Sequence, residues 1–138
     1  METLVIAEAG VNHNGDLALA LELVDKAKAA GADMIKFQSF SAHKIATRNA
    51  RKASYQRRAT SGSDEQLSML RRLELSRTDH EKLFRHCMKR KITFFSTAFD
   101  EESFDMLINL GVQQVKIPSG EITNFLSTDA KAILRDSK

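Results

Sequence analysis

The order of short apolar runs and longer helical patterns constrains the fold of this chain most strongly. Four short runs rich in branched and aromatic residues are typical of buried strands, and segments with apolar residues at helical spacing follow them. Strands that alternate with helices in this way pair in parallel through helical crossovers. The sequence therefore predicts an α/β fold with strands at residues 4–7, 34–38, 92–96 and 112–117.

Local signals at helix ends place the helices between these strands. Asp16 is an expected N-cap, and the helix that follows it ends at Gly31. Capping boxes at Ser63–Gln66 and Thr78–Glu81 open two further helices before the third strand. A helix near residues 101–110 precedes the fourth strand, and the tail at residues 127–135 is also expected to be helical.

Chain length selects between the two parallel architectures, an open doubly wound sheet and a barrel. Neither a Gly-x-Gly-x-x-Gly turn nor a Walker loop follows the first strand, which weakens the nucleotide-binding version of the open sheet. A complete (β/α)₈ barrel takes ~250 residues. The 138 residues of this chain would therefore make one unit, about half of a TIM barrel.

The net charge of +3 comes from one segment, because residues 41–62 contain six basic residues and no acidic one. Three interpretations of this segment stay open: a solvated loop, a loop that attracts an anionic small substrate, and a nucleic-acid contact. Tyr55 is its only aromatic residue and no nucleic-acid-binding motif is present, so we expect no nucleic-acid partner.

Several classes of protein are disfavoured by composition. Cys87 is the only cysteine, which excludes an internal disulfide and fits a reducing, cytoplasmic environment; its place on a helical apolar stripe predicts core packing. No apolar run approaches the ~20 residues of a membrane span, and no signal peptide is visible, so we expect no membrane partner. The four histidines and Cys87 have no zinc-binding spacing.

Polar residues cluster where the expected strands end, which is where parallel α/β folds bind ligands. A lysine in an apolar strand needs a partner, and this chain has two such lysines, Lys36 and Lys116. Either they form buried ion pairs with Glu8 and Glu121, or they bind an anionic ligand. In the second case the hydroxyls of Thr97 and Ser119 and the backbone N–H of Gly120 would help to bind the anion, and both glutamates would be candidate acid/base groups.

Five stretches, in order along residues 4–126, resemble the N-acetylneuraminate (sialic acid) synthase family, which includes legionaminate and pseudaminate synthases and spore-coat polysaccharide proteins. These stretches are Ile6–Gly15, Gly31–Gln38, Leu73–Ser76, Phe95–Thr97 and Lys116–Asn124. The first and the last together are the most specific part of the resemblance.

The resemblance implies a transferase that condenses phosphoenolpyruvate with an N-acylated mannosamine-like sugar, giving a nine-carbon 2-keto acid and phosphate. It implies that Gln38 touches the sugar and that Glu8 and Glu121 act as acid/base or intermediate-stabilising carboxylates. It further implies that phosphoenolpyruvate is held by four residues: Lys36, Thr97, Lys116 and Ser119. A divalent metal, Mn²⁺ or Mg²⁺, would polarise the sugar aldehyde.

The chain also departs from the family pattern. Ala98 stands where proline is usual, and Pro118 stands where glycine or alanine is usual. The family's metal-binding histidines and its C-terminal antifreeze-like domain would lie beyond residue 138. An alternative is therefore a truncated, catalytically silent half-barrel acting in oligomerisation or ligand binding. We expect such a chain to self-associate, because two sheet edges would be open.

No histidine in this chain is expected to bind the metal. His13 lies in an Asn-His-Asn segment and is expected to be a hydrogen-bonded turn residue. His43, His80 and His86 are expected in loops or on helix surfaces.

Overall fold

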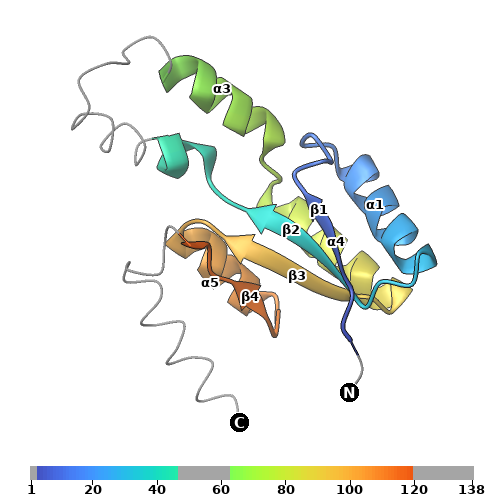
Figure 1. Cartoon of the computed structure of the whole chain (residues 1–138). Coiled ribbons are helices and arrows are strands. Elements are labelled where there is room, and N and C mark those ends of the chain that lie inside the picture. The colour runs from blue at the N-terminus through green and yellow to red at the C-terminus, as the bar shows by residue number, and fades with distance from the viewer. Residues whose placement is uncertain (1–2, 47–62, 120–138) are drawn as a thin grey trace.

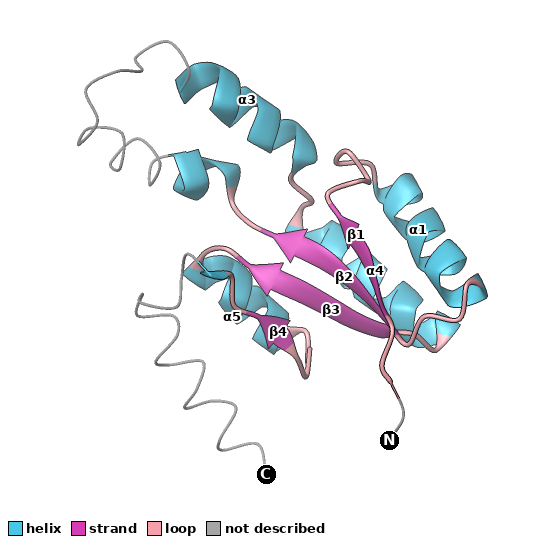
Figure 2. Cartoon of the chain, in the orientation of Figure 1, coloured by secondary structure: helices cyan, strands magenta, loops and turns pink. Residues whose placement is uncertain are grey.

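The computed structural model describes residues 3–46 and 63–119, and within them it contains one parallel sheet with strand order β1-β2-β3-β4 (Figures 1 and 2). The strands are β1 (Ile6–Gly10), β2 (Met34–Ser39), β3 (Thr93–Ala98) and β4 (Val115–Lys116). The helices are α1 (Leu17–Ala29), α3 (Ser63–Leu73), α4 (Arg77–Arg90) and α5 (Glu101–Asn109). The predicted α/β class with parallel strands is confirmed.

Two strands differ from their predicted bounds. The strand expected at residues 112–117 is reduced to Val115–Lys116, because Val112 N donates to Leu107 O and so closes the end of α5 after Gly111. Strand β1 begins at Ile6, two residues later than expected, and continues to Gly10. The helix predicted at residues 127–135 lies outside the described residues.

The helix starts follow side-chain caps. Asp16 caps α1 as predicted, accepting hydrogen bonds from the backbone of Ala18 and Leu19. The predicted box at Thr78–Glu81 does not begin α4, because Ser76 is the N-cap and accepts from Asp79 N at 3.1 Å. Residues 42–46, which the sequence placed in a loop, are helical.

Helices α1, α4 and α5 pack against one face of the sheet, where a single core cluster forms (Figure 1). Phe37 of β2 is fully buried there and stacks on Phe94 of β3, with ring centroids 5.7 Å apart. Cys87 of α4 is buried in the same core, as predicted, and burial raises the pKa of its thiol to about 12. Such a thiol stays protonated and inert near neutral pH.

Side chains alternate between the two faces along each strand, so the residues next to the core positions point to the opposite face. That opposite face carries Glu8, Lys36, Phe95 and Lys116, which are partly or fully exposed. We call it the open face. None of the helices in residues 3–46 and 63–119 is long and apolar enough to cross a membrane.

Candidate functional site

The register of the sheet brings Glu8 and Lys36 side by side on the open face, where they form an ion pair. The Lys36 side chain is 15% exposed, whereas that of Glu8 is 52% exposed. The sequence left open whether Lys36 forms an ion pair with a glutamate, and the structure shows that it pairs with Glu8. Because the carboxylate is accessible to solvent, it can also face a ligand bound over the strand ends.

A second row lies one pleat further along the strands. Gln38 of β2, Thr97 of β3 and Lys116 of β4 are register partners on the open face. Neighbouring parallel strands are about 5 Å apart, so the three side chains begin at adjacent positions across the sheet. Thr97 is buried and Lys116 is exposed. With Lys36, they place two cations, an amide and a hydroxyl near the carboxyl ends of three strands.

Ser119 and Glu121 complete the set of sequence-predicted residues. Ser119 is exposed and lies three residues beyond Lys116, at the end of the second described segment. Glu121 lies outside the described residues, so its pairing with a strand lysine and its acid/base role stay predictions.

Gly10 shapes this site in a way the sequence analysis did not anticipate. Its backbone is left-handed, with φ of +54°, at the irregularity that follows Glu8 in the β1–β2 pairing. A Cβ atom at this position would lie 3.4 Å from Glu8 Oε1 and 3.6 Å from Gln38 Nε2. The carboxylate and the amide therefore border the same small space, which glycine leaves free. The available signal was a glycine two residues after Glu8, the polar residue at the end of the predicted strand.

A buried histidine–serine cluster lies on the core side of the same strand ends. His80 is 2% exposed, so its predicted surface position is wrong. Its Nδ1 lies 3.0 Å from Ser76 O and its Nε2 lies 2.9 Å from Ser39 Oγ, which in turn lies 2.8 Å from Ser96 Oγ. Since Ser76 O can only accept, Nδ1 donates to it and Nε2 accepts from the Ser39 hydroxyl. Helical spacing alone could not show that position 80 faces the sheet.

His13 is a turn residue, as predicted. It is fully buried, and its Nδ1 accepts a hydrogen bond from Gly15 N at 3.0 Å. Its Nε2 is the one buried side-chain nitrogen or oxygen that lacks a partner within the described residues. His86 is half-buried between α1 and α4, where it pairs with Asp25 at 2.8 Å. His43 is exposed in the helical residues 42–46.

Because His13 and His80 are buried, we expect the free energy of unfolding to decrease in mild acid. Burial lowers the pKa of His80 and of His13 below the ordinary value of 6.5. Below about pH 6.5 the unfolded chain therefore binds more protons than the folded chain, and stability decreases as pH falls. Urea unfolding at pH 8, 7 and 5.5 measures how the free energy of unfolding changes with pH. His80→Gln should make the free energy of unfolding less dependent on pH over this range, and an unchanged dependence in His80→Gln would contradict this role.

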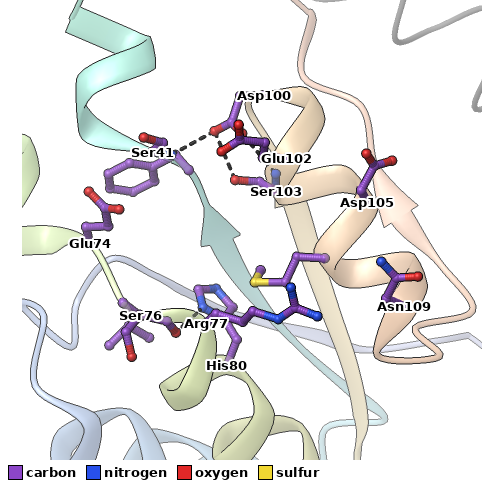
Figure 3. Close-up of a pocket in the computed structure, with 13 residues that line it drawn as sticks. Ser41, Glu74, Ser76, Arg77, His80, Asp100, Glu102, Ser103, Asp105 and Asn109 are labelled. Atoms are coloured by element: carbon purple, nitrogen blue, oxygen red, sulfur yellow. Dashed lines mark hydrogen bonds between the residues drawn. The ribbon is translucent and has the colours of Figure 1, made fainter.

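A cavity of about 420 Å³ lies beside the same cluster, between the start of α4 and helix α5 (Figure 3). Two of the carboxylates that line it, Asp100 and Glu74, have protein partners. Asp100 accepts from Ser41 N at 2.7 Å and from Ser103 Oγ at 2.9 Å, and Glu74 accepts from Ala42 N at 3.0 Å. These contacts attach residues 41–46 to the helices. None of the open-face residues lines this cavity.

No group of three or more histidine, cysteine, aspartate and glutamate side chains that could hold a metal ion occurs in residues 3–46 and 63–119. The described part of the chain therefore does not itself form the divalent-metal site that the resemblance implies. The expectation of a metal stays untested.

Curated relatives of this chain include two enzymes with nearly equal identity. The chain is 52% identical over 123 residues to the N,N'-diacetyllegionaminic acid synthase of Campylobacter jejuni, covering 89% of this chain and 37% of that protein. It is 53% identical over 124 residues to the enzyme of the same name from Legionella pneumophila, covering 90% and 35%. The chain thus spans about a third of the length of these relatives.

A solved structure shares the fold. The N-acetylneuraminic acid synthetase of Leptospira borgpetersenii matches with a TM-score of 0.79 at 31% identity, covering 97% of this chain and 42% of that one. The model of the NeuB family matches residues 23–133. The resemblance seen in the sequence motifs is therefore confirmed, and the chain belongs to the NeuB family.

Proposed function

We propose that this chain carries the phosphoenolpyruvate-binding part of a synthase that joins phosphoenolpyruvate to an N-acylated mannosamine-like sugar. The observation that supports this most directly is the pair of rows on the open face, where Lys36 and Lys116 flank Gln38 and Thr97. A trianionic substrate needs two cations and hydroxyl donors at such a site. Membership of a family whose relatives are named as sugar-acid synthases supports an enzyme of this kind.

In the proposed reaction, C3 of phosphoenolpyruvate attacks the sugar aldehyde carbon, and the aldehyde oxygen takes up a proton. Water adds to C2, and phosphate leaves by cleavage of the C–O bond, which yields the 2-keto acid. Lys36 and Lys116 neutralise the carboxylate and phosphate charges, with Thr97 and Ser119 as hydroxyl donors. Glu8 is accessible beside Lys36, so we assign it as the base that takes a proton from the attacking water.

Lys116→Ala tests this binding mode. Because Lys116 is exposed on the short strand β4, its removal should change the free energy of unfolding by less than about 0.5 kcal/mol. Phosphoenolpyruvate affinity, measured by isothermal titration calorimetry, should fall about tenfold to hundredfold, as expected for one lost charge-assisted hydrogen bond. Lys82→Ala on α4 is the matched control. Unchanged affinity together with lost stability would indicate a structural ion pair instead.

A second candidate is a catalytically silent unit that binds ligand and self-associates. It is favoured by an apolar segment at the start of β1, where Leu4, Val5 and Ile6 are 66%, 53% and 45% exposed. Exposed apolar residues at a sheet edge are typical of an association surface.

The 138-residue chain is accordingly expected to sediment as species larger than its 15.5 kDa monomer. Leu4→Lys should shift the distribution toward monomer, because a charge at a sheet edge opposes further pairing. Met88→Lys is a matched control, since Met88 is equally exposed at 65% but lies on α4. A sharp monomeric boundary for the unmodified chain would contradict this candidate.

A further inference from the structure

The core side of the sheet changes from apolar to polar at the level of the second row on the open face. Phe37 of β2 and Phe94 of β3 fill the core one pleat earlier, whereas Ser39 and Ser96 take the next positions on the same face. Both serines are fully buried, and His80 of α4 packs over them with 2% of its surface exposed. Each of these polar groups would be costly to bury without a hydrogen-bond partner.

The hydrogen bonds of this histidine–serine cluster, formed by Ser39, Ser96 and His80, run in one direction. Because His80 Nδ1 donates to Ser76 O, His80 Nε2 accepts the single hydroxyl proton of Ser39. Ser39 then has no second proton, so Ser96 donates in the 2.8 Å contact between the two hydroxyls. Every side-chain donor of the cluster therefore has one acceptor, which leaves these side chains a single arrangement.

The cluster joins the ends of the two strands that carry Gln38 and Thr97. Ser39 directly follows Gln38, and Ser96 directly precedes Thr97, whereas Gln38 and Thr97 are register partners on the open face. The backbone adds to this connection, since Phe99 N donates to Ser39 O at 3.1 Å. A displacement of either serine on the core side would therefore move a side chain of the second row on the opposite side.

Packing alone does not require polar residues at these positions. Apolar side chains of similar size would fill the same space, and replacing both partners of a buried hydrogen bond in this way is nearly neutral for stability. A fully paired polar network instead makes the residues that carry it more rigid. We propose that Ser39, Ser96 and His80 are positioning residues, which hold Thr97 and Gln38 in place for the substrate. That Thr97 receives phosphoenolpyruvate rests on the proposed function.

The direct test replaces the whole cluster with apolar residues in the 138-residue chain, by combining Ser39→Ala, Ser96→Ala and His80→Leu. The substitutions leave Ser76 O paired, because the backbone N–H of residue 80 donates to it at 3.0 Å. The free energy of unfolding in urea should be unchanged or higher. Phosphoenolpyruvate affinity, measured by calorimetry, should fall about three- to tenfold, as expected for one misaligned hydrogen bond to the ligand.

A spectroscopic measurement tests the positioning without any ligand. The methyl group of Thr97 and the side-chain amide of Gln38 should have lower NMR order parameters in the triple variant, because neither is held in one orientation. The methyl groups of Val24, which is fully buried on α1, should keep the order parameters of the unmodified chain. This comparison separates a local loss of position from a general loosening of the fold.

Two further variants separate positioning from stability. His80→Gln keeps an acceptor for the Ser39 hydroxyl and should recover most of the phosphoenolpyruvate affinity that the triple variant loses. Cys87→Ala removes a buried side chain from the same face of α4 and leaves the cluster intact. The Cys87→Ala variant should have a lower free energy of unfolding and an unchanged phosphoenolpyruvate affinity.

Ser96→Ala alone keeps the contact between Ser39 and His80 and serves as the test if the triple variant does not fold. It should weaken phosphoenolpyruvate binding about threefold. Normal binding in Ser96→Ala and in the folded triple variant would overturn the positioning role and leave the proposed function standing. An equal loss of affinity in Cys87→Ala would also overturn the positioning role, because lost stability would then explain both results.

The failure of the proposed function would look different. Absence of phosphoenolpyruvate binding in the unmodified chain would overturn the proposed function. The order parameters of Thr97 and Gln38 would then decide the positioning role by themselves, and unchanged values in the triple variant would overturn it.

Discussion

Replacing Lys36 with methionine should weaken phosphoenolpyruvate binding by about 30-fold or more. Lys36 is the less exposed of the two lysines on the open face, and loss of a largely desolvated cation opposite a charged partner typically costs about 2–5 kcal/mol. Stability should change little, because methionine fills a similar volume and Glu8, which is half-exposed, can return to water. Calorimetric titration and urea unfolding measure the two effects separately.

Lys26→Met is the control for the change in charge. Lys26 lies on α1 with a 71% exposed side chain in a surface pair with Glu22, away from the open face. The Lys26→Met substitution should leave phosphoenolpyruvate affinity unchanged. If Lys36→Met bound phosphoenolpyruvate normally but unfolded at lower urea, the Glu8–Lys36 pair would be a structural feature and the proposed site would be wrong.

The second large effect is expected at the core face. Phe37→Ala should lower the free energy of unfolding by about 3–5 kcal/mol, because the side chain is fully buried between His13 and Phe94. Phe95→Ala, on the open face of the neighbouring strand, removes the same ring from a half-buried position and should cost much less. The midpoints of urea unfolding curves measure the difference between the two losses of stability, provided that both variants keep the same denaturant dependence of the free energy of unfolding.

Equal losses for Phe37→Ala and Phe95→Ala would contradict the assignment of the two faces. In that case the open face would also be packed in solution, for example against another copy of the chain. The comparison therefore tests the placement of the candidate site as well as the position of the core.

Much of the secondary structure was predictable because its signals are local. A short, mostly apolar segment such as Met34–Phe37 favours a strand in a parallel sheet, and Asp16 can cap a helix with its own side chain. Alternation of such segments implies parallel strands, so the open-face residues were expected together at the strand ends before the register was known.

The position of His80 was predicted wrongly because it depends on packing between distant segments. His80 looks like a surface residue from helical spacing, yet it is buried because Ser39 and Ser96, far away in the chain, supply its polar partners. The fourth strand is shorter than predicted for a local reason, because the backbone N–H of Val112 bonds to Leu107 O at the end of α5 instead of extending the sheet. No local pattern contains the contacts that bury His80.

The sequence by itself therefore determined the α/β class, most helix and strand positions, the NeuB family motifs and the residues proposed to bind phosphoenolpyruvate. The tertiary structure alone decided that Lys36 pairs with Glu8, that Gly10 leaves space between Glu8 and Gln38, and that the histidine–serine cluster joins the ends of β2 and β3. The physical reason is that secondary structure follows from neighbours within a few residues, whereas burial and pairing depend on side chains that only the folded chain brings together.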